Sequence, residues 1–180
     1  MFDFKEMELK GLFLITPQVF NDNRGFFMET FKKSDFQKIG IDREFLQDNH
    51  SRSIKGVLRG LHYQAGEHAQ GKLIRCIRGA IFDVAVDIRP DSKTFGKWCA
   101  VTLSEDNYQQ LFIPEGFAHG YYTLTDTADI LYKATREYAP NADKGIIWND
   151  PDINIDWQTK TPILSDKDKL HPKFKDIKEF

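Results

Sequence analysis

The stretch FDVAVDIR (residues 82–89) decides the fold class of this chain. Its large apolar residues occupy every second position from Phe82 to Ile88, and they alternate with Asp83, Ala85 and Asp87. A repeat of two residues is the period of a β-strand, because successive side chains of a strand point to opposite faces. The stretch therefore predicts a strand.

Similar short strands are predicted on both sides of this stretch. Apolar runs return about every 8–12 residues between Gly, Pro, Asn and Asp clusters, as in all-β sandwiches and barrels. The last expected strand is IIW (residues 146–148), and helices are expected only at residues 32–40 and in the charged tail, residues 165–180. We expect one domain over residues 1–180, all-β, with a jelly roll as the leading architecture.

Charge and cysteine content narrow the classes of function. A net charge of −2 gives no electrostatic basis for binding nucleic acid or an anionic membrane. Cys76 lies in an apolar run and Cys99 follows Trp98, which favours buried free thiols over a disulfide or a metal site. The acidic N-terminus lacks an apolar signal core and no run is long enough to span a membrane, so we expect a soluble cytoplasmic protein.

The segment GVLRGLHYQ (residues 56–64) carries the first candidate site. In a straight strand Arg59 and His62 would face opposite sides of the sheet. Glycine inside a strand often marks a bulge, and a bulge at Gly60 would bring both side chains into one cavity. The alternative interpretation is a surface hairpin with one solvated histidine.

Three chemistries compete for such a cavity. A metal site is disfavoured, because Gln64 and Gly60 stand where a second ligand two residues from His62 would be, and only His119 matches a later histidine. A nucleophilic hydrolase is also disfavoured, because no Gly-x-Ser-x-Gly occurs and neither cysteine has a histidine nearby in sequence. Acid–base chemistry on a bound anion fits the residue types, with histidine as base, tyrosine as acid and Arg or Lys on phosphates.

Seven segments, in order, resemble the dTDP-4-dehydrorhamnose 3,5-epimerase family. They are NDNRGFFMETF, FLQDNHSRSIKGVLRGLHYQ, QGKLIRCIRGAIFDVAVDIR, TFGKW, IPEGFAHG, LYKATREYAP and GIIWNDP. The resemblance implies a cupin-type jelly roll (a double-stranded β-helix barrel) with short peripheral helices. It also implies an enzyme that works without a metal or another cofactor, generally as a homodimer.

The resemblance also implies a mechanism. The C4 ketone of dTDP-4-dehydro-6-deoxy-D-glucose acidifies the protons on C3 and C5, and reprotonation of each enolate from the opposite face inverts the carbon. By this resemblance His62 is the base, Asp168 orients its imidazole, Tyr132 is the acid and Lys72 stabilises the enolate oxygen. Asp83 remains an alternative partner of His62, since both acids lie near expected strand ends.

Further positions match the family's substrate contacts, with Tyr138 matching the aromatic residue that stacks on thymine. At Asp143 the family more often has glutamate, and the shorter side chain reduces the reach by one methylene. The implied substrate-binding residues are Arg24, Glu29, Gln47, Asp48, Asn49, Arg59, Lys72, His119, Tyr138, Asp143 and Lys167.

Two alternatives remain beside the implied product, dTDP-4-dehydro-L-rhamnose, an intermediate of dTDP-L-rhamnose biosynthesis. A related dTDP-sugar 3-epimerase or ketoisomerase would share the base and the nucleotide pocket but reprotonate other carbons. A non-catalytic sugar-nucleotide-binding cupin would keep Arg24, Arg59 and Tyr138 but would not need the pair His62 and Tyr132, which this sequence has.

Overall fold

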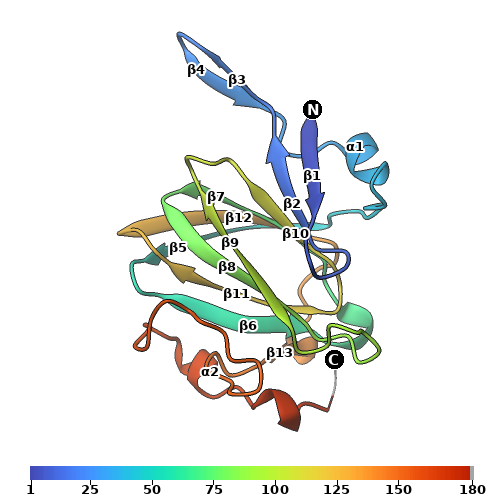
Figure 1. Ribbon diagram of the computed structural model, residues 1–180, viewed down its shortest axis with the longest axis vertical. Coiled ribbons are helices and arrows are strands. Elements are labelled where there is room, and N and C mark those ends of the chain that lie inside the picture. Colours follow the sequence, from blue (N-terminus) through green and yellow to red (C-terminus); the bar gives the residue numbers. More distant parts are fainter. Residues whose placement is uncertain (179–180) are drawn as a thin grey trace.

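The computed structural model describes residues 1–178, and most of its regular structure is antiparallel β-strand (Figure 1). The strands are β1 (Phe2–Glu6), β2 (Phe13–Pro17), β3 (Val19–Asp22), β4 (Gly25–Met28), β5 (Gln47–Ile54), β6 (Leu58–Gln64), β7 (Lys72–Arg78), β8 (Ala80–Asp87), β9 (Trp98–Ser104), β10 (Gln110–Ile113), β11 (Phe117–Thr123), β12 (Thr127–Ala134) and β13 (Asp143–Gly145). The α-helices are α1 (Lys33–Gln37) and α2 (Asp166–Lys169), and the 3₁₀ turns are Gly66–His68, Pro140–Ala142 and Phe174–Asp176.

Two sheets form the barrel. The six-stranded sheet has the order β1-β2-β10-β7-β12-β5, and the five-stranded sheet has the order β13-β6-β11-β8-β9. Between them lies a core that includes Leu12, Ile74, Ile81, Leu103 and Leu111, all fully buried. The prediction of an all-β jelly roll of the cupin type with short peripheral helices is therefore confirmed.

Strand β8 is buried on both faces. Ile81 and Ala85 pack into the core between the sheets, whereas Val84 and Val86 pack on the outer side of the five-stranded sheet against Trp157. The side chain of Asp83 alternates with those of Val84 and Val86 and is fully buried in the barrel. The period of two thus does not separate a buried face from a solvated one here.

The C-terminal segment, orange to red in Figure 1, runs along the outer face of the five-stranded sheet. The strand predicted at residues 146–148 is wrong, because the strand β13 ends at Gly145. Ile146 still exchanges backbone hydrogen bonds with Leu61 of β6, but the N–H of Ile147 donates to the carbonyl of Pro172 at 2.9 Å. The backbone therefore leaves the sheet at this point.

The N-terminal region covers the outer face of the six-stranded sheet. The predicted helix at residues 32–40 is confirmed as α1, whose Phe36 is fully buried among Phe2, Phe4 and Phe31. Gly40 follows the helix with φ of 85°, a left-handed conformation that glycine adopts without strain. Beside this region the β3–β4 hairpin projects away from the barrel (Figure 1).

Both cysteines are free thiols, as predicted, but only Cys76 is buried, whereas Cys99 is partly exposed. Burial raises the pKa of the Cys76 thiol to about 11, so it is protonated and unreactive at neutral pH. Within the described part of the chain, no helix has the length and hydropathy needed to span a membrane.

Candidate active site

A β-bulge in β6 shapes the site. Arg59 is paired with Tyr121, and His62 with His119, so β6 has one residue more than β11 between the two pairs. Gly60 lies in this stretch with φ of 131°, and a Cβ atom there would come within 2.6 Å of the Cα of Gly120. The bulge predicted at Gly60 is confirmed.

Because of the bulge, Arg59 and His62 share one hollow of about 290 Å³. Ser165, Lys167 and Asp168, from the start of α2 and the residue before it, line the same hollow. The structure therefore brings the arginine and the histidine together, as the bulge hypothesis required.

A second cavity, of about 180 Å³, lies between the two sheets and also contains His62. His62 comes from the five-stranded sheet, whereas Lys72 and Tyr132 come from the six-stranded sheet, so the histidine and the tyrosine face the cavity from opposite sheets. The cavity is lined by Gln47, Asn49, His62, Tyr63, Gln64, Gln70, Lys72, Tyr132, Tyr138, Asp143 and Lys167.

His62 and Asp168 form a histidine–carboxylate pair. His62 Nε2 lies 2.5 Å from Asp168 Oδ1, and Asp168 is almost fully buried. Ser165 caps α2: its hydroxyl donates to Asp168 Oδ2 at 2.8 Å and accepts from the Asp168 N–H at 3.1 Å. The first turn of α2 therefore fixes the carboxylate opposite the imidazole.

The electrostatics of this pair favour a charged carboxylate and a neutral imidazole. Burial opposes ionisation of Asp168, but the nearby His171 imidazole and the hydrogen bonds from His62 and Ser165 outweigh it and hold the pKa of the carboxyl well below its usual range. Burial lowers the pKa of His62, and the Asp168 carboxylate partly offsets this shift. A neutral imidazole at physiological pH is the form that accepts a proton.

The pKa values of Lys72 and Tyr132 are shifted by the same low-dielectric surroundings. Burial lowers the pKa of Lys72 to about 8. The carboxylates of Asp83 and Asp143 stabilise its charged form and offset part of this shift. Burial raises the pKa of Tyr132, so its phenol stays protonated at neutral pH. The cavity thus holds a neutral base, a protonated phenol and a lysine close to its titration point.

Asp83 has a different partner. Its Oδ1 lies 2.7 Å from His119 Nε2, and both side chains are largely buried. The structure therefore pairs Asp168 with His62 and Asp83 with His119. Of the two acids that the sequence left open as partners of His62, the partner is Asp168.

The mouth of the cavity is bridged by Asp143. Its Oδ2 accepts a hydrogen bond from the Tyr138 hydroxyl at 2.7 Å and forms an ion pair with Lys167 of α2. Gln47 accepts from the Tyr138 N–H at 2.8 Å and donates to Asn49 at 2.9 Å. The shorter acid at position 143 is thus within reach of two other predicted binding residues.

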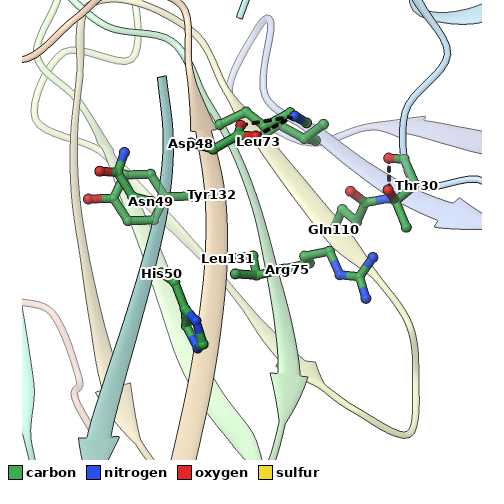
Figure 2. A pocket seen from close by; sticks show the side chains of 10 residues that line it. Thr30, Asp48, Asn49, His50, Leu73, Arg75, Gln110, Leu131 and Tyr132 are labelled. Carbon is green, nitrogen blue, oxygen red and sulfur yellow. Dashed lines mark hydrogen bonds and ion pairs between the residues drawn. The ribbon is translucent and has the colours of Figure 1, made fainter. Parts of the chain in front are cut away.

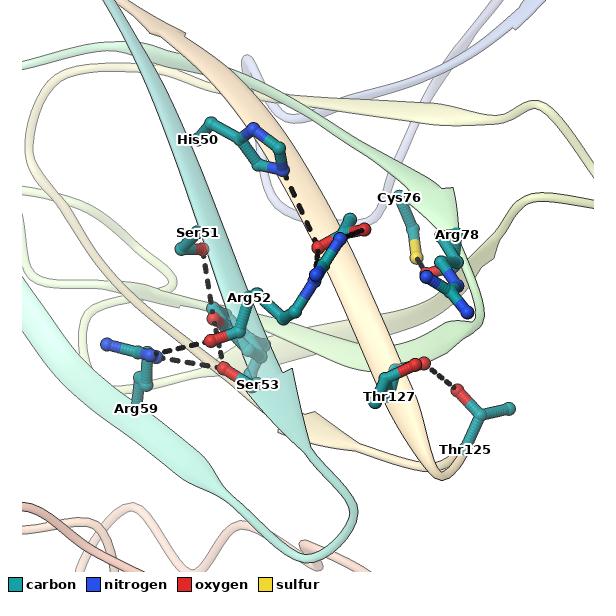
Figure 3. A network of polar contacts seen from close by, with 11 residues as sticks. His50, Ser51, Arg52, Ser53, Arg59, Cys76, Arg78, Thr125 and Thr127 are labelled. Carbon is teal, nitrogen blue, oxygen red and sulfur yellow. Dashed lines mark hydrogen bonds and ion pairs between the residues drawn. The ribbon is translucent and has the colours of Figure 1, made fainter.

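Arg59 is held in place by β5 (Figure 3). Its Nε donates to Ser53 Oγ at 3.0 Å, and its Nη2 donates to the carbonyl of Arg52 at 3.1 Å. The hydroxyl of Tyr121 lies within 3.2 Å of both Ser51 and Ser53, so this polar network is itself fixed between the sheets. The guanidinium is therefore oriented by its neighbours, with one nitrogen, Nη1, outside these contacts.

Besides His119, which lines neither of the two hollows, three predicted binding residues are not brought to the cavity within one chain. Asp48 points to the opposite face of β5 from Asn49 and pairs with Lys133 at 2.9 Å, whereas Asn49 lies beside Tyr132 (Figure 2). Arg24 is exposed on the β3–β4 hairpin and pairs with Asp22 at 2.6 Å.

Glu29, the third of these residues, follows β4. Its Oε2 lies 3.5 Å from the N-terminal amine. Its carboxylate is therefore engaged at the N-terminal end of the chain and not in the cavity.

His171 was missed by the sequence analysis. Its ring lies edge-on to that of His62, with centroids 5.5 Å apart, and its Nε2 lies 3.5 Å from Asp168 Oδ1. The available signal was its position three residues after Asp168, the spacing of neighbours on one helix face in a tail predicted to be helical. Gln70 also lines the cavity, and the sequence showed no signal for it.

The barrel has the cupin fold, and its cavity holds His62 of the five-stranded sheet, paired with Asp168 of α2, opposite Tyr132 of the six-stranded sheet. A sequence model described as dTDP-4-dehydrorhamnose 3,5-epimerase matches residues 6–176. The chain belongs to this family.

Known relatives agree with this assignment. The chain is 58% identical over 164 residues to a dTDP-4-dehydrorhamnose 3,5-epimerase from Escherichia coli K12, covering 90% of this chain and 89% of the relative. It also resembles the crystal structure of a dTDP-6-deoxy-D-glucose-3,5-epimerase from Legionella pneumophila in complex with dTDP-4-keto-L-rhamnose. That similarity has a TM-score of 0.95 and 44% identity, over 99% of this chain and 95% of the other.

A more distant structure has a narrower activity. It is a 3'-monoepimerase from Streptomyces bikiniensis in complex with dTDP-quinovose, with a TM-score of 0.87 and 34% identity over 93% of this chain and 85% of the other. The fold alone therefore does not distinguish epimerisation at one carbon from epimerisation at two.

Proposed function

We propose that the protein inverts C3 and C5 of dTDP-4-dehydro-6-deoxy-D-glucose and so produces dTDP-4-dehydro-L-rhamnose. The observation that carries this proposal is the placement of His62 and Tyr132 on opposite sheets around one cavity. Inversion of a carbon through an enolate needs a base on one face of the sugar and an acid on the other. The match to 3,5-epimerases along almost the whole chain supports both carbons as targets.

In this mechanism His62 Nδ1 removes the proton, because Nε2 is engaged by Asp168. The electron pair of the C–H bond moves to the C4 oxygen, where the Lys72 ammonium stabilises the enolate charge. Asp168 stabilises the imidazolium that forms, and Tyr132 donates a proton to the opposite face of the carbon. The step is redox-neutral, and proton exchange with solvent resets both residues.

The remaining residues of the cavity would bind the dTDP group. Arg59 and Lys167 supply positive charge for the diphosphate, and Gln47 and Asn49 supply hydrogen bonds. His119, held by Asp83, and Asp143 would contact the substrate from the five-stranded sheet. Tyr138 would stack on thymine, since its ring is half exposed at the mouth.

The position of Arg24 and Glu29 supports a homodimer. Arg24 lies on a projecting hairpin, outside the chain's own cavity, and the hairpin also exposes Phe20, Phe26 and Phe27. Exposed aromatic side chains of this kind are typical of interfaces. We infer that this hairpin packs on a second copy, and that the enzyme acts on its nucleotide sugar in the cytoplasm.

NMR of the product formed in D₂O tests the proposed function. Deuterium at both C3 and C5 with both carbons inverted is the expected result. Label and inversion at C3 alone would instead support a 3-epimerase, the second candidate, which the Streptomyces bikiniensis structure keeps open.

Activity should fall on the alkaline side of about pH 8. The lowered pKa of Lys72 means that its ammonium is present below this pH and is lost above it, so the enolate loses its cation as pH rises. Lys72→Arg should move the alkaline limb of kcat upward, because arginine titrates only above about pH 12. A pH series of kcat checks this, with the exposed Lys38→Arg as control. An unchanged alkaline limb in Lys72→Arg would assign that limb to another group.

Substitutions of Tyr138 should separate its ring from its hydroxyl. Tyr138→Phe should bind dTDP nearly as well as the wild type, since stacking needs only the ring. Tyr138→Ala should lose about 1–3 kcal/mol of binding free energy, the range for base–aromatic stacking. Calorimetry with dTDP measures both variants. Equal losses would show that the hydroxyl, through its bond to Asp143, carries the contribution.

A further inference from the structure

Three ligand-type atoms converge beside the cavity. One atom each from His62, Asp168 and His171 lies within 4.8 Å of the other two. Asp168 Oδ1 lies between the histidines, 2.5 Å from His62 Nε2 and 3.5 Å from His171 Nε2. The role proposed for His62 and Asp168 does not need a second histidine at this carboxylate.

The second histidine has a buried nitrogen without a hydrogen bond. The side chain of His171 is only 9% exposed, and its Nε2 has no hydrogen-bond partner among residues 1–178. Leaving a buried polar atom unpaired is unfavourable, because the atom has lost its hydrogen bonds to water. Such an atom, directed at a carboxylate that already binds another imidazole, indicates a ligand position.

The chain fixes His171 in this position. A Cβ atom at Gly145 would come within 2.4 Å of the imidazole ring, so the glycine makes the room that the ring occupies. The next residue, Pro172, accepts a backbone hydrogen bond from Ile147 at 2.9 Å. The ring is thus held between β13 and the end of α2, so the segment that carries it is already in place before a ligand binds.

We propose that His62, Asp168 and His171 form a binding site for one divalent transition-metal ion of the zinc type, and that the bound ion inhibits the enzyme. Two imidazole nitrogens and one carboxylate oxygen are common zinc ligands, with bonds of about 2.0–2.2 Å. Tetrahedral ligands at that distance are about 3.3 Å apart. Asp168 Oδ1 reaches this separation from both histidine nitrogens with shifts below about 1 Å, and the ligand atoms of the two histidines lie within 4.8 Å of each other.

Inhibition follows from the two nitrogens of one ring. A metal ion on His62 Nε2 needs the lone pair of that nitrogen, so the single proton of the neutral ring moves to Nδ1. Nδ1 is then unable to accept a proton from the sugar. Inhibition therefore rests on the proposed role of His62, whereas binding of the ion does not.

The surrounding charges act in both directions. Lys72 and Lys167 line the cavity with His62 and oppose a cation, whereas Asp143 in the same lining favours it. Magnesium should not bind, because it prefers oxygen ligands in octahedral geometry.

Calorimetry without substrate tests binding alone. Protein dialysed against EDTA should bind one Zn²⁺ per chain at this site, and His171→Gln should weaken this binding at least about tenfold. His50→Gln is the matched control: His50 also faces a carboxylate, Asp129 at 3.5 Å, but lies on the outer face of the six-stranded sheet. Wild-type affinity in His171→Gln would overturn the site.

Two measurements on the wild type are independent of how the variant folds. Zn²⁺ should shift the NMR signals of two histidine rings, and Co²⁺ should give the visible spectrum of a four-coordinate site. Shifts of other histidines only, or no cobalt spectrum, would contradict the proposal.

Turnover tests inhibition separately. The EDTA-treated enzyme should work at the full rate, Zn²⁺ should inhibit it, Mg²⁺ should not, and His171→Gln should need at least about tenfold more Zn²⁺. Calorimetric binding without slower turnover would overturn the inhibition. Zn²⁺ binding by a protein that turns over no dTDP-sugar would leave the site intact and refute the proposed function instead.

Discussion

His62→Ala should abolish both the exchange of substrate protons with D₂O and the inversion of C3 and C5. His62 is the residue that we expect to remove both protons, and Asp168 stabilises only the imidazolium that this removal creates. Removing one general base typically lowers the rate by roughly 10²–10⁴-fold. The loss should appear in kcat more than in the affinity for dTDP, because the nucleotide contacts are left in place.

NMR of substrate incubated in D₂O measures this exchange directly. His50→Ala serves as control, since His50 lies on the outer face of the six-stranded sheet. A His62→Ala variant that still incorporates deuterium at near the wild-type rate would move the base to another residue.

Tyr132→Phe should separate exchange from inversion. Without the phenol, the enolate loses the acid on its second face, and protonated His62 returns a proton to the face from which it was taken. Recovered substrate should therefore carry deuterium with its configuration retained, while formation of the inverted product falls by roughly 10²–10⁴-fold.

Tyr122→Phe is the matched control, because Tyr122 packs into the core on the outer side of the five-stranded sheet. NMR resolves label and configuration in one sample. A Tyr132→Phe enzyme that inverts both carbons at near the wild-type rate would remove Tyr132 from the mechanism.

The fold class was predictable because strand period and turn spacing are local properties. The stretch containing Phe82 and Val84 predicted β8 correctly, but the pattern did not reveal that both faces of β8 are buried. Burial of Asp83 depends on His119, which lies on a neighbouring strand far along the chain. The strand predicted at residues 146–148 was wrong because Pro172, in the C-terminal segment, takes the hydrogen bond of Ile147.

The candidate site was predictable in residue type and only partly in position. The bulge at Gly60 followed from local sequence, whereas the pairing of His62 with Asp168 depends on the path of the C-terminal segment. Asp48 shows the limit of carrying a family position over: alternation along β5 directs it away from Asn49. The contributions of Asp48, and of Arg24 on the hairpin, to substrate binding stay predictions.

The contact between His62 and Asp168 spans 106 positions of the chain. A ribosome that adds about 5–20 residues per second needs roughly 5–20 s to travel from one residue to the other. The barrel strands β6 to β12 are all synthesised before α2. A nascent chain thus carries His62 long before it carries Asp168, so this histidine–carboxylate pair forms only after the C-terminal segment has been synthesised.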